Sequence, residues 1–107
     1  MFEHISVQQL VELKSKQTVN IVDIRDGQSF AAGHIVGATL LTNENVPQFI
    51  ASTDKEAALV VCCYHGNSSQ GAAQYLSEQE FKHVYSLDGG FDVWKVSQPN
   101  EVEQGNS

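Results

Sequence analysis

Residues 59–73 read Leu59-Val60-Val61-Cys62-Cys63-Tyr64-His65-Gly66-Asn67-Ser68-Ser69-Gln70-Gly71-Ala72-Ala73, an apolar run that ends in cysteine and leads through a polar loop into small residues. The apolar run predicts a buried strand, and the small residues after the loop predict the start of a helix. A loop that curls into a helix N-terminus aims several backbone N–H groups at one point, where the helix dipole also favours an anion. A cysteine beside such a group of donors is held as thiolate, which is the nucleophilic form. The stretch therefore predicts a thiol catalyst that handles an anionic substrate.

Short apolar strands alternate with helical segments along the rest of the chain, which is typical of an α/β domain with a mostly parallel sheet. We expect strands near residues 2–5, 18–24, 39–41, 58–62 and 84–87, and helices near residues 6–16, 26–32, 46–50, 69–80 and 91–95. Residues 58–62 are too apolar to have a solvated face, so they should form a central strand. Right-handed crossovers place ligands outside the carboxyl ends of central strands, where the loop after Cys63 begins.

Two helices carry capping signals at their ends. Ser6 should cap the first helix, with Gln9 three residues later to complete a capping box. Asp26 should cap a short second helix, and Gly33 is suited to a left-handed residue at the end of that helix. These local signals support the helical boundaries predicted from hydrophobic spacing.

The length and charge of the chain limit the classes of protein to which it can belong. Its 107 residues suffice for one domain with a substantial core, and we expect this domain over residues 1–97, with a polar, frayed tail over residues 98–107. A net charge of −7 without a basic stripe argues against binding to nucleic acid or to an acidic membrane surface. The sequence shows neither a transmembrane span nor a signal peptide, so we expect a cytoplasmic protein.

The cysteine pattern argues against a disulfide framework and against a metal centre. Cys62 and Cys63 are adjacent, and a bridge between neighbouring cysteines is strained and rare. The chain has no pair of cysteines or histidines at the spacing that metal sites use. We therefore expect two free thiols and no metal.

Four segments of the chain together resemble a known family. They are residues 21–26 (IVDIRD), residues 33–38 (GHIVGA), the loop after Cys63, and residues 87–94 (LDGGFDVW), in that order. This order resembles the rhodanese family, in particular its single-domain GlpE-type thiosulfate sulfurtransferases. The resemblance implies a three-layer α/β/α fold with a five-stranded parallel sheet. It also implies that a cysteine, Cys63 by the match, accepts sulfane sulfur from thiosulfate as a persulfide and passes it to cyanide or to a thiol such as a thioredoxin-like dithiol. The covalent persulfide would be the only intermediate, with no cofactor.

The residues that follow Cys63 form the expected anion cradle, chiefly through their backbone; they are Tyr64, His65, Gly66, Asn67, Ser68 and Ser69. Gly66 can adopt positive φ, and Asn67 tolerates it better than most residues. The two serine hydroxyls can donate to sulfur or cap the next helix. His65 is the only candidate cation within the loop, and it either helps an anion dock or simply faces solvent. Tyr64 is expected to be a rim or packing residue.

Asp23 and Arg25 follow a predicted buried strand and raise two interpretations. An Arg25–carboxylate pair would brace this side of the site, whereas the alternative is direct contact between Arg25 and substrate. Cys62, inside the strand, is expected to pack in the core, with a role as a resolving thiol as the alternative. His34 is expected to be a hydrogen-bonded structural histidine. Three aromatic residues are expected in the core, namely Phe30, Phe91 and Trp94.

Two other functions compete with sulfur transfer. A phosphatase or arsenate reductase would need an arginine six residues after the cysteine, but that position is Ser69 and the loop holds no arginine. A persulfide carrier or binding module that uses a donor other than thiosulfate remains open. The loop lacks the basic residues that larger rhodaneses place near their cysteine, and the charge of −7 slows the approach of a dianion.

Overall fold

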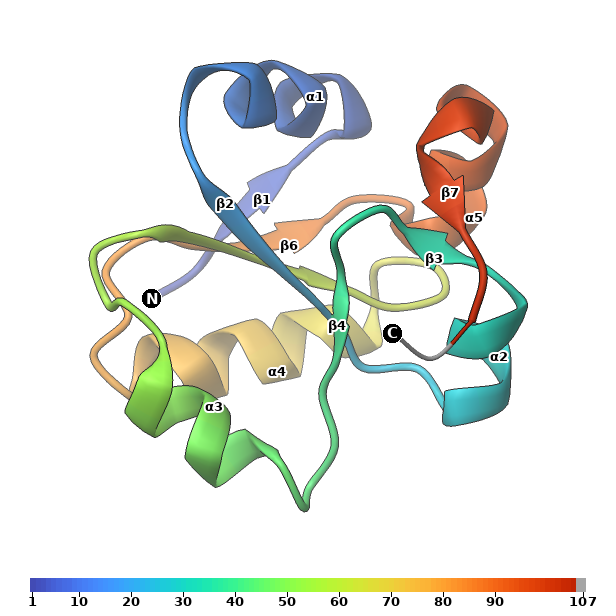
Figure 1. Cartoon of the computed structure of the whole chain (residues 1–107). Coiled ribbons are helices and arrows are strands. Elements are labelled where there is room, and N and C mark those ends of the chain that lie inside the picture. Colours follow the sequence, from blue (N-terminus) through green and yellow to red (C-terminus); the bar gives the residue numbers. More distant parts are fainter. Residues whose placement is uncertain (106–107) are drawn as a thin grey trace.

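The computed structural model describes residues 1–105, which form a five-stranded parallel sheet with helices on both faces (Figure 1). The strands lie in the order β1-β6-β5-β2-β4, and every neighbouring pair runs parallel. Their bounds are β1 Glu3–Ile5, β2 Val19–Asp23, β4 Thr39–Leu40, β5 Ala58–Cys62 and β6 Val84–Leu87. The predicted five-stranded parallel sheet is confirmed.

Five α-helices cover the sheet in the described part of the chain. Their bounds are α1 Val7–Lys16, α2 Gly27–Ala32, α3 Val46–Ser52, α4 Ser68–Ser77 and α5 Gly90–Ser97. Buried residues of α1, α2 and α5 pack into one core cluster, and those of α4 join α3 in a second cluster. Figure 1 shows α1 and α5 on one side of the sheet and α3 and α4 on the other, which is the predicted three-layer arrangement.

Strand β5 is the middle strand of the sheet and is buried along its whole length. Its side chains alternate between the two core clusters, with Val60 and Cys62 in one and Leu59 and Val61 in the other. This confirms the prediction of a central strand without a solvated face. Cys63 therefore follows the carboxyl end of the middle strand, at the centre of the side of the sheet where the parallel strands end.

The capping predictions hold at two helix starts and are wrong at one helix end. Gln9 N–H donates to Ser6 Oγ at 3.1 Å and Ser6 N–H donates to Gln9 Oε1 at 2.9 Å, which is the expected capping box. Asp26 caps α2 through Ser29 N–H at 2.7 Å. Gly33, however, has an extended backbone (φ 174°, ψ 135°) rather than a left-handed one. The chain leaves α2 directly into a further strand, so no reversal is needed there.

The chain after α5, where we expected a polar, frayed tail, continues into two further short elements. A 3-10 turn (Pro99–Glu101) leads into β7 (Val102–Glu103), which pairs antiparallel with β3 (His34–Ile35). Trp94 Nε1–H donates to the carbonyl of Glu101 at 3.0 Å and secures the turn. The polar composition concealed these contacts because most of them are made by the backbone. Residues 106–107 lie outside the described residues.

No helix within residues 1–105 is long and apolar enough to cross a membrane.

Candidate active site

The sulfur of Cys63 lies almost fully buried at the end of β5, surrounded by hydrogen-bond donors. The backbone N–H of Gly66 donates to Sγ at 3.1 Å, and that of Ser69 donates at 3.2 Å. The Ser69 hydroxyl lies 3.2 Å from the same sulfur. These three contacts come from the loop after Cys63 and from the first turn of α4, within six residues of the cysteine.

The sulfur takes the place of a helix cap at the start of α4. Asn67 is the N-cap residue, but its side chain makes no capping hydrogen bond. Ser69 is the second residue of the helix, and its N–H, which a cap normally satisfies, donates instead to Cys63 Sγ. The positive end of the α4 dipole therefore faces the sulfur and favours the thiolate. Ser68 and Ser69 lie inside the first turn, so neither caps the helix.

The hydrogen-bond donors around Cys63 together affect the pKa of its thiol more strongly than its burial does. Burial by itself raises the pKa of the thiol, because it disfavours a charged sulfur. The Ser69 hydroxyl and the N–H groups of Ser69, Gly66 and His65 act in the opposite direction, and together they hold the pKa of Cys63 below its ordinary value. The loop thus maintains a nucleophilic form of the thiol within a mostly buried site.

Close backbone contacts fix the loop in this shape. Gly66 has φ +90°, as its place in the loop predicted, and a Cβ on it would lie 2.8 Å from the backbone nitrogen of Gly89. Behind the loop, the first N–H groups of α5 bind its carbonyls. Phe91 N–H donates to the Cys63 carbonyl at 2.8 Å, and Asp92 N–H donates to the Tyr64 carbonyl at 3.1 Å. The N-terminus of a second helix, α5, therefore supports the backbone of the loop.

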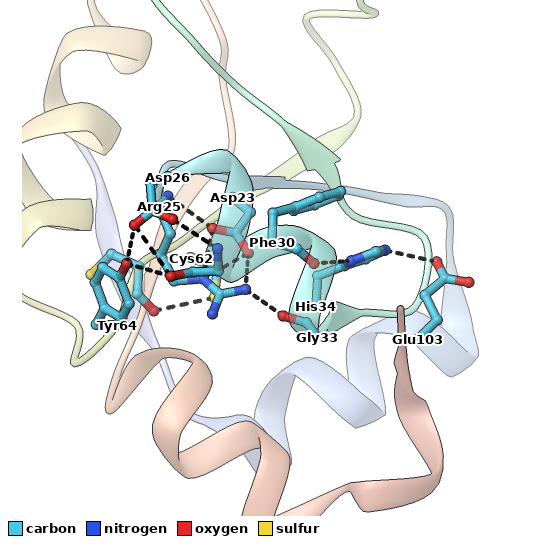
Figure 2. A network of polar contacts seen from close by, with 11 residues as sticks. Asp23, Arg25, Asp26, Phe30, Gly33, His34, Cys62, Tyr64 and Glu103 are labelled. Atoms are coloured by element: carbon cyan, nitrogen blue, oxygen red, sulfur yellow. Dashed lines mark hydrogen bonds and ion pairs between the residues drawn. The ribbon is translucent and has the colours of Figure 1, made fainter. Parts of the chain in front are cut away.

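Two side-chain contacts tie the rim of the loop to neighbouring elements. Tyr64 O–H donates to Asp26 Oδ2 at 2.7 Å, which links the loop to the cap of α2 (Figure 2). His65 Nδ1 lies 2.8 Å from Asp92 Oδ2 on α5, and both side chains are partly exposed. Tyr64 is thus a rim residue, as predicted. The candidate cation His65 is already paired with a carboxylate, which the sequence analysis did not anticipate.

Arg25 and Asp23 form a buried ion pair (Figure 2). Arg25 Nη2 donates to Asp23 Oδ2 at 2.8 Å, and Nε donates to Asp23 Oδ1 at 3.0 Å. Nη2 also donates to the Gly33 carbonyl at 2.6 Å, and the guanidinium lies 4.3 Å from the Phe91 ring centre. With Nε and Nη2 hydrogen-bonded and one face of the guanidinium against Phe91, Arg25 is placed to brace β2 against α2 and α5. This geometry favours bracing over contact with substrate.

Cys62 and His34 are both buried away from the Cys63 sulfur. Cys62 packs in the core cluster beneath α1 and α5, and burial raises the pKa of its thiol. His34 Nδ1–H donates to the Phe30 carbonyl at 2.7 Å, while its Nε2 faces Glu103 Oε1 of β7 at 3.4 Å (Figure 2). The His34 ring stacks on Phe30 with 3.8 Å between centroids. Phe30, Phe91 and Trp94 are buried, as expected of core residues.

The residues that could bind a metal are not gathered in one place. Within residues 1–105, no three side chains of His, Cys, Asp or Glu lie close enough together to hold an ion.

The structure adds two residues to the site that the sequence analysis missed. Asp92 pairs with His65, and Ser86 of β6 lies with its hydroxyl 2.7 Å from that of Ser69. Ser86 is fully buried in an otherwise apolar strand. A lone serine among the apolar residues of a buried strand was a signal of such a contact, because a buried hydroxyl needs a hydrogen-bond partner.

Comparison with known proteins shows which family and fold the chain resembles. The sequence profile of the rhodanese-like domain matches residues 6–97. The chain is 52% identical to thiosulfate sulfurtransferase GlpE of Pseudomonas putida, covering 99% of this chain and 96% of the relative. It is 60% identical to thiosulfate sulfurtransferase GlpE of Shewanella oneidensis, covering 87% and 92%. Among solved structures, the rhodanese-like domain of an Anabaena sp. protein superposes with a TM-score of 0.84 at 26% identity, covering 99% of this chain and 82% of that one.

Proposed function

The chain belongs to the rhodanese-like domain family, and we propose that its Cys63 thiolate carries sulfur from thiosulfate to an acceptor. It is a thiosulfate sulfurtransferase, an enzyme of the rhodanese type, like the GlpE relatives that it matches over most of its length. The proposal concerns which residues do the chemistry. The observation that carries it is the buried Cys63 sulfur, which has two N–H groups directed at it and the Ser69 hydroxyl 3.2 Å away.

In the first half-reaction, the Cys63 thiolate attacks the outer sulfur of thiosulfate. A bond forms between Sγ and that sulfur, and the bond from that sulfur to the sulfonate group breaks. The electron pair of the broken bond leaves with sulfite, which is a good leaving group. The total charge is unchanged, because a thiolate and a dianion become a persulfide anion and a dianion.

In the second half-reaction, an acceptor attacks the terminal sulfur of the Cys63 persulfide. The electron pair of the S–S bond returns to Sγ and regenerates the thiolate. Cyanide becomes thiocyanate, whereas a thiolate becomes a persulfide. A thioredoxin-like dithiol in the cytoplasm is the acceptor that we propose, since its second thiol can release the transferred sulfur as hydrogen sulfide and leave a disulfide.

The cradle supplies electrostatic stabilisation rather than proton transfer. The first half-reaction needs no general base, because the attacking Cys63 sulfur is already ionised and sulfite leaves without a proton. In the second, the acceptor attacks as an anion, either cyanide or a thiolate, and the Cys63 thiolate leaves without a proton. Fixed N–H groups stabilise negative charge without the reorganisation that water would require. The nearest imidazole in the loop, that of His65, is paired with Asp92 and is not needed as a base.

The loop also distinguishes this function from that of a phosphatase or an arsenate reductase. A phosphatase or arsenate reductase needs an arginine that binds its substrate through two parallel hydrogen bonds. Here the sixth residue after Cys63 is Ser69, which contacts the sulfur itself. Arg25 Nη2 is bound to Asp23 and to the Gly33 carbonyl. A persulfide carrier that loads from another donor is the second candidate, favoured by the absence of an unpaired cation at the loop among the described residues.

Initial-rate kinetics with thiosulfate and cyanide test the proposal. Double displacement predicts parallel double-reciprocal lines as the second substrate is varied. Cys63→Ser should abolish turnover, and Cys62→Ser should retain it because Cys62 lies in the core. Intersecting lines would contradict a persulfide intermediate, and activity that survives Cys63→Ser would contradict the assignment of the nucleophile.

A further inference from the structure

A chain of two buried hydroxyls leads from the core to the Cys63 sulfur. Ser86 Oγ lies 2.7 Å from Ser69 Oγ, which lies 3.2 Å from Cys63 Sγ. Both serines are fully buried. Within residues 1–105, the Ser86 hydroxyl has one hydrogen-bond partner, which is Ser69 Oγ.

The number of protons in this chain fixes the direction of its hydrogen bonds. Each hydroxyl has one proton to donate. If Ser69 donated to Ser86, the proton of Ser86 would be buried without an acceptor, which is unfavourable. If Ser86 donates to Ser69, the proton of Ser69 points to the sulfur, and both protons are satisfied.

The protonation state of Cys63 decides whether every proton in this series of hydrogen bonds has an acceptor. With a thiolate, two protons fill two contacts, Ser86 to Ser69 and Ser69 to sulfur. With a thiol, three protons share the same two contacts, so one proton is left over. The two hydroxyls therefore favour the thiolate form of Cys63. The Ser69 hydroxyl is also a stronger donor to the sulfur because it already accepts a hydrogen bond from Ser86.

Packing alone does not explain a serine at this position. Ser86 lies in β6 opposite Val61 of the neighbouring strand β5, and its chain neighbour Leu87 is fully buried. Burying a hydroxyl in apolar surroundings carries a cost that an alanine or valine would avoid. The pairing of β6 with β5 places the Ser86 hydroxyl within hydrogen-bond distance of the Ser69 hydroxyl.

We propose that Ser86 is a positioning residue that orients the Ser69 hydroxyl toward Cys63 and so increases the thiolate fraction. Its role rests on the proposed function of Cys63 as the sulfur carrier. Ser86 does not touch the reacting sulfur, and it acts only through Ser69. Loss of its hydroxyl should therefore change the reactivity of Cys63 without removing any direct contact to it.

The rate of Cys63 alkylation by iodoacetamide as a function of pH tests this role. The variants Ser86→Thr and Ser86→Val introduce side chains of nearly the same shape, and only threonine keeps the hydroxyl. Below the thiol pKa, the valine variant should be alkylated about three- to tenfold more slowly than the threonine variant, since each pKa unit is a tenfold change in thiolate. Peptide mass mapping assigns the alkylation to Cys63, and thermal unfolding checks that both variants are folded.

A second background shows whether the effect passes through Ser69. In Ser69→Ala, the difference between the threonine and valine variants should disappear. Equal rates in the native background, or a difference that persists in Ser69→Ala, would overturn the proposal. If the larger side chains prevent folding, Ser86→Ala against the native protein, in both backgrounds, carries the same comparison. Alkylation needs no sulfur donor, so this result is independent of whether thiosulfate loads the enzyme.

Discussion

Replacing Gly66 by alanine tests whether the shape of the loop sets the reactivity of Cys63. Gly66 has φ +90°, and a Cβ there would lie 2.8 Å from Gly89 N and 3.0 Å from Leu87 O. Gly37 provides a matched control, because it has φ +85° but a Cβ on it would meet nothing within 4 Å. Both variants force alanine into the left-handed region, but only Gly66→Ala also collides with backbone.

The structure gives different magnitudes for the two variants. A left-handed alanine costs roughly 1–2 kcal/mol, so Gly37→Ala should lower the free energy of unfolding by that amount. Gly66→Ala adds overpacking of roughly 1–3 kcal/mol, for a total of about 2–5 kcal/mol. The alanine also pushes the Gly66 N–H away from the sulfur. A hydrogen bond to a charged group is worth about 1.5–3 kcal/mol, so the thiolate fraction below the pKa should fall about 10- to 100-fold.

Urea denaturation and the pH profile of iodoacetamide alkylation measure the two effects separately. Gly37→Ala should lose stability and keep the alkylation profile of the native protein. Gly66→Ala should lose more stability and shift its profile to higher pH. If both variants lost the same stability and were alkylated alike, the close fit of Gly66 against the β6–α5 turn would not control the thiolate.

Three further predictions address the ion pair, the thiol and the net charge. Arg25→Lys keeps the charge but breaks the paired hydrogen bonds to buried Asp23, so urea denaturation should show a loss of about 1.5–3 kcal/mol; unchanged stability with a raised KM for thiosulfate would instead indicate substrate contact. The lowered pKa of Cys63 contributes stability that is present above the unfolded thiol pKa of about 8.5 and is lost as pH falls through the folded pKa. Cys63→Ser should therefore cost more stability near pH 9 than near pH 6, and an equal cost at both would count against a stabilised thiolate. Because the chain carries a net charge of −7, raising sodium chloride from about 10 to 150 mM should lower the KM for thiosulfate as the Debye length shrinks from about 30 to 8 Å; an unchanged KM would mean that long-range repulsion does not limit binding.

Features with a local cause were predictable from the sequence. The capping box of Ser6 and Gln9 lies within four residues, and its hydrogen bonds form as expected. The apolar residues of β5 predicted a buried central strand. Gly66 predicted a loop with a positive φ, which places donors around Cys63. Each of these depends on neighbours in the chain, which a sequence displays directly.

Features that join distant segments were not predictable in the same way. Gly33 was expected to turn left-handed, but β3 pairs with β7 from the other end of the chain and keeps it extended. The Asp92–His65 and Ser86–Ser69 contacts each join the loop to another element. The lone serine in β6 indicates that its hydroxyl has some partner, but no nearby residue of Ser86 or Asp92 indicates which partner, because the fold brings each pair together from distant parts of the chain.

The most direct test of the account is an intact-mass spectrum after incubation with thiosulfate, followed by cyanide. The native protein and Cys62→Ser should each gain one sulfur atom, Cys63→Ser should gain none, and cyanide should remove the added sulfur. Loading that requires Cys62, or a native protein that gains no sulfur from thiosulfate, would contradict the central claim that the Cys63 thiolate carries the transferred sulfur.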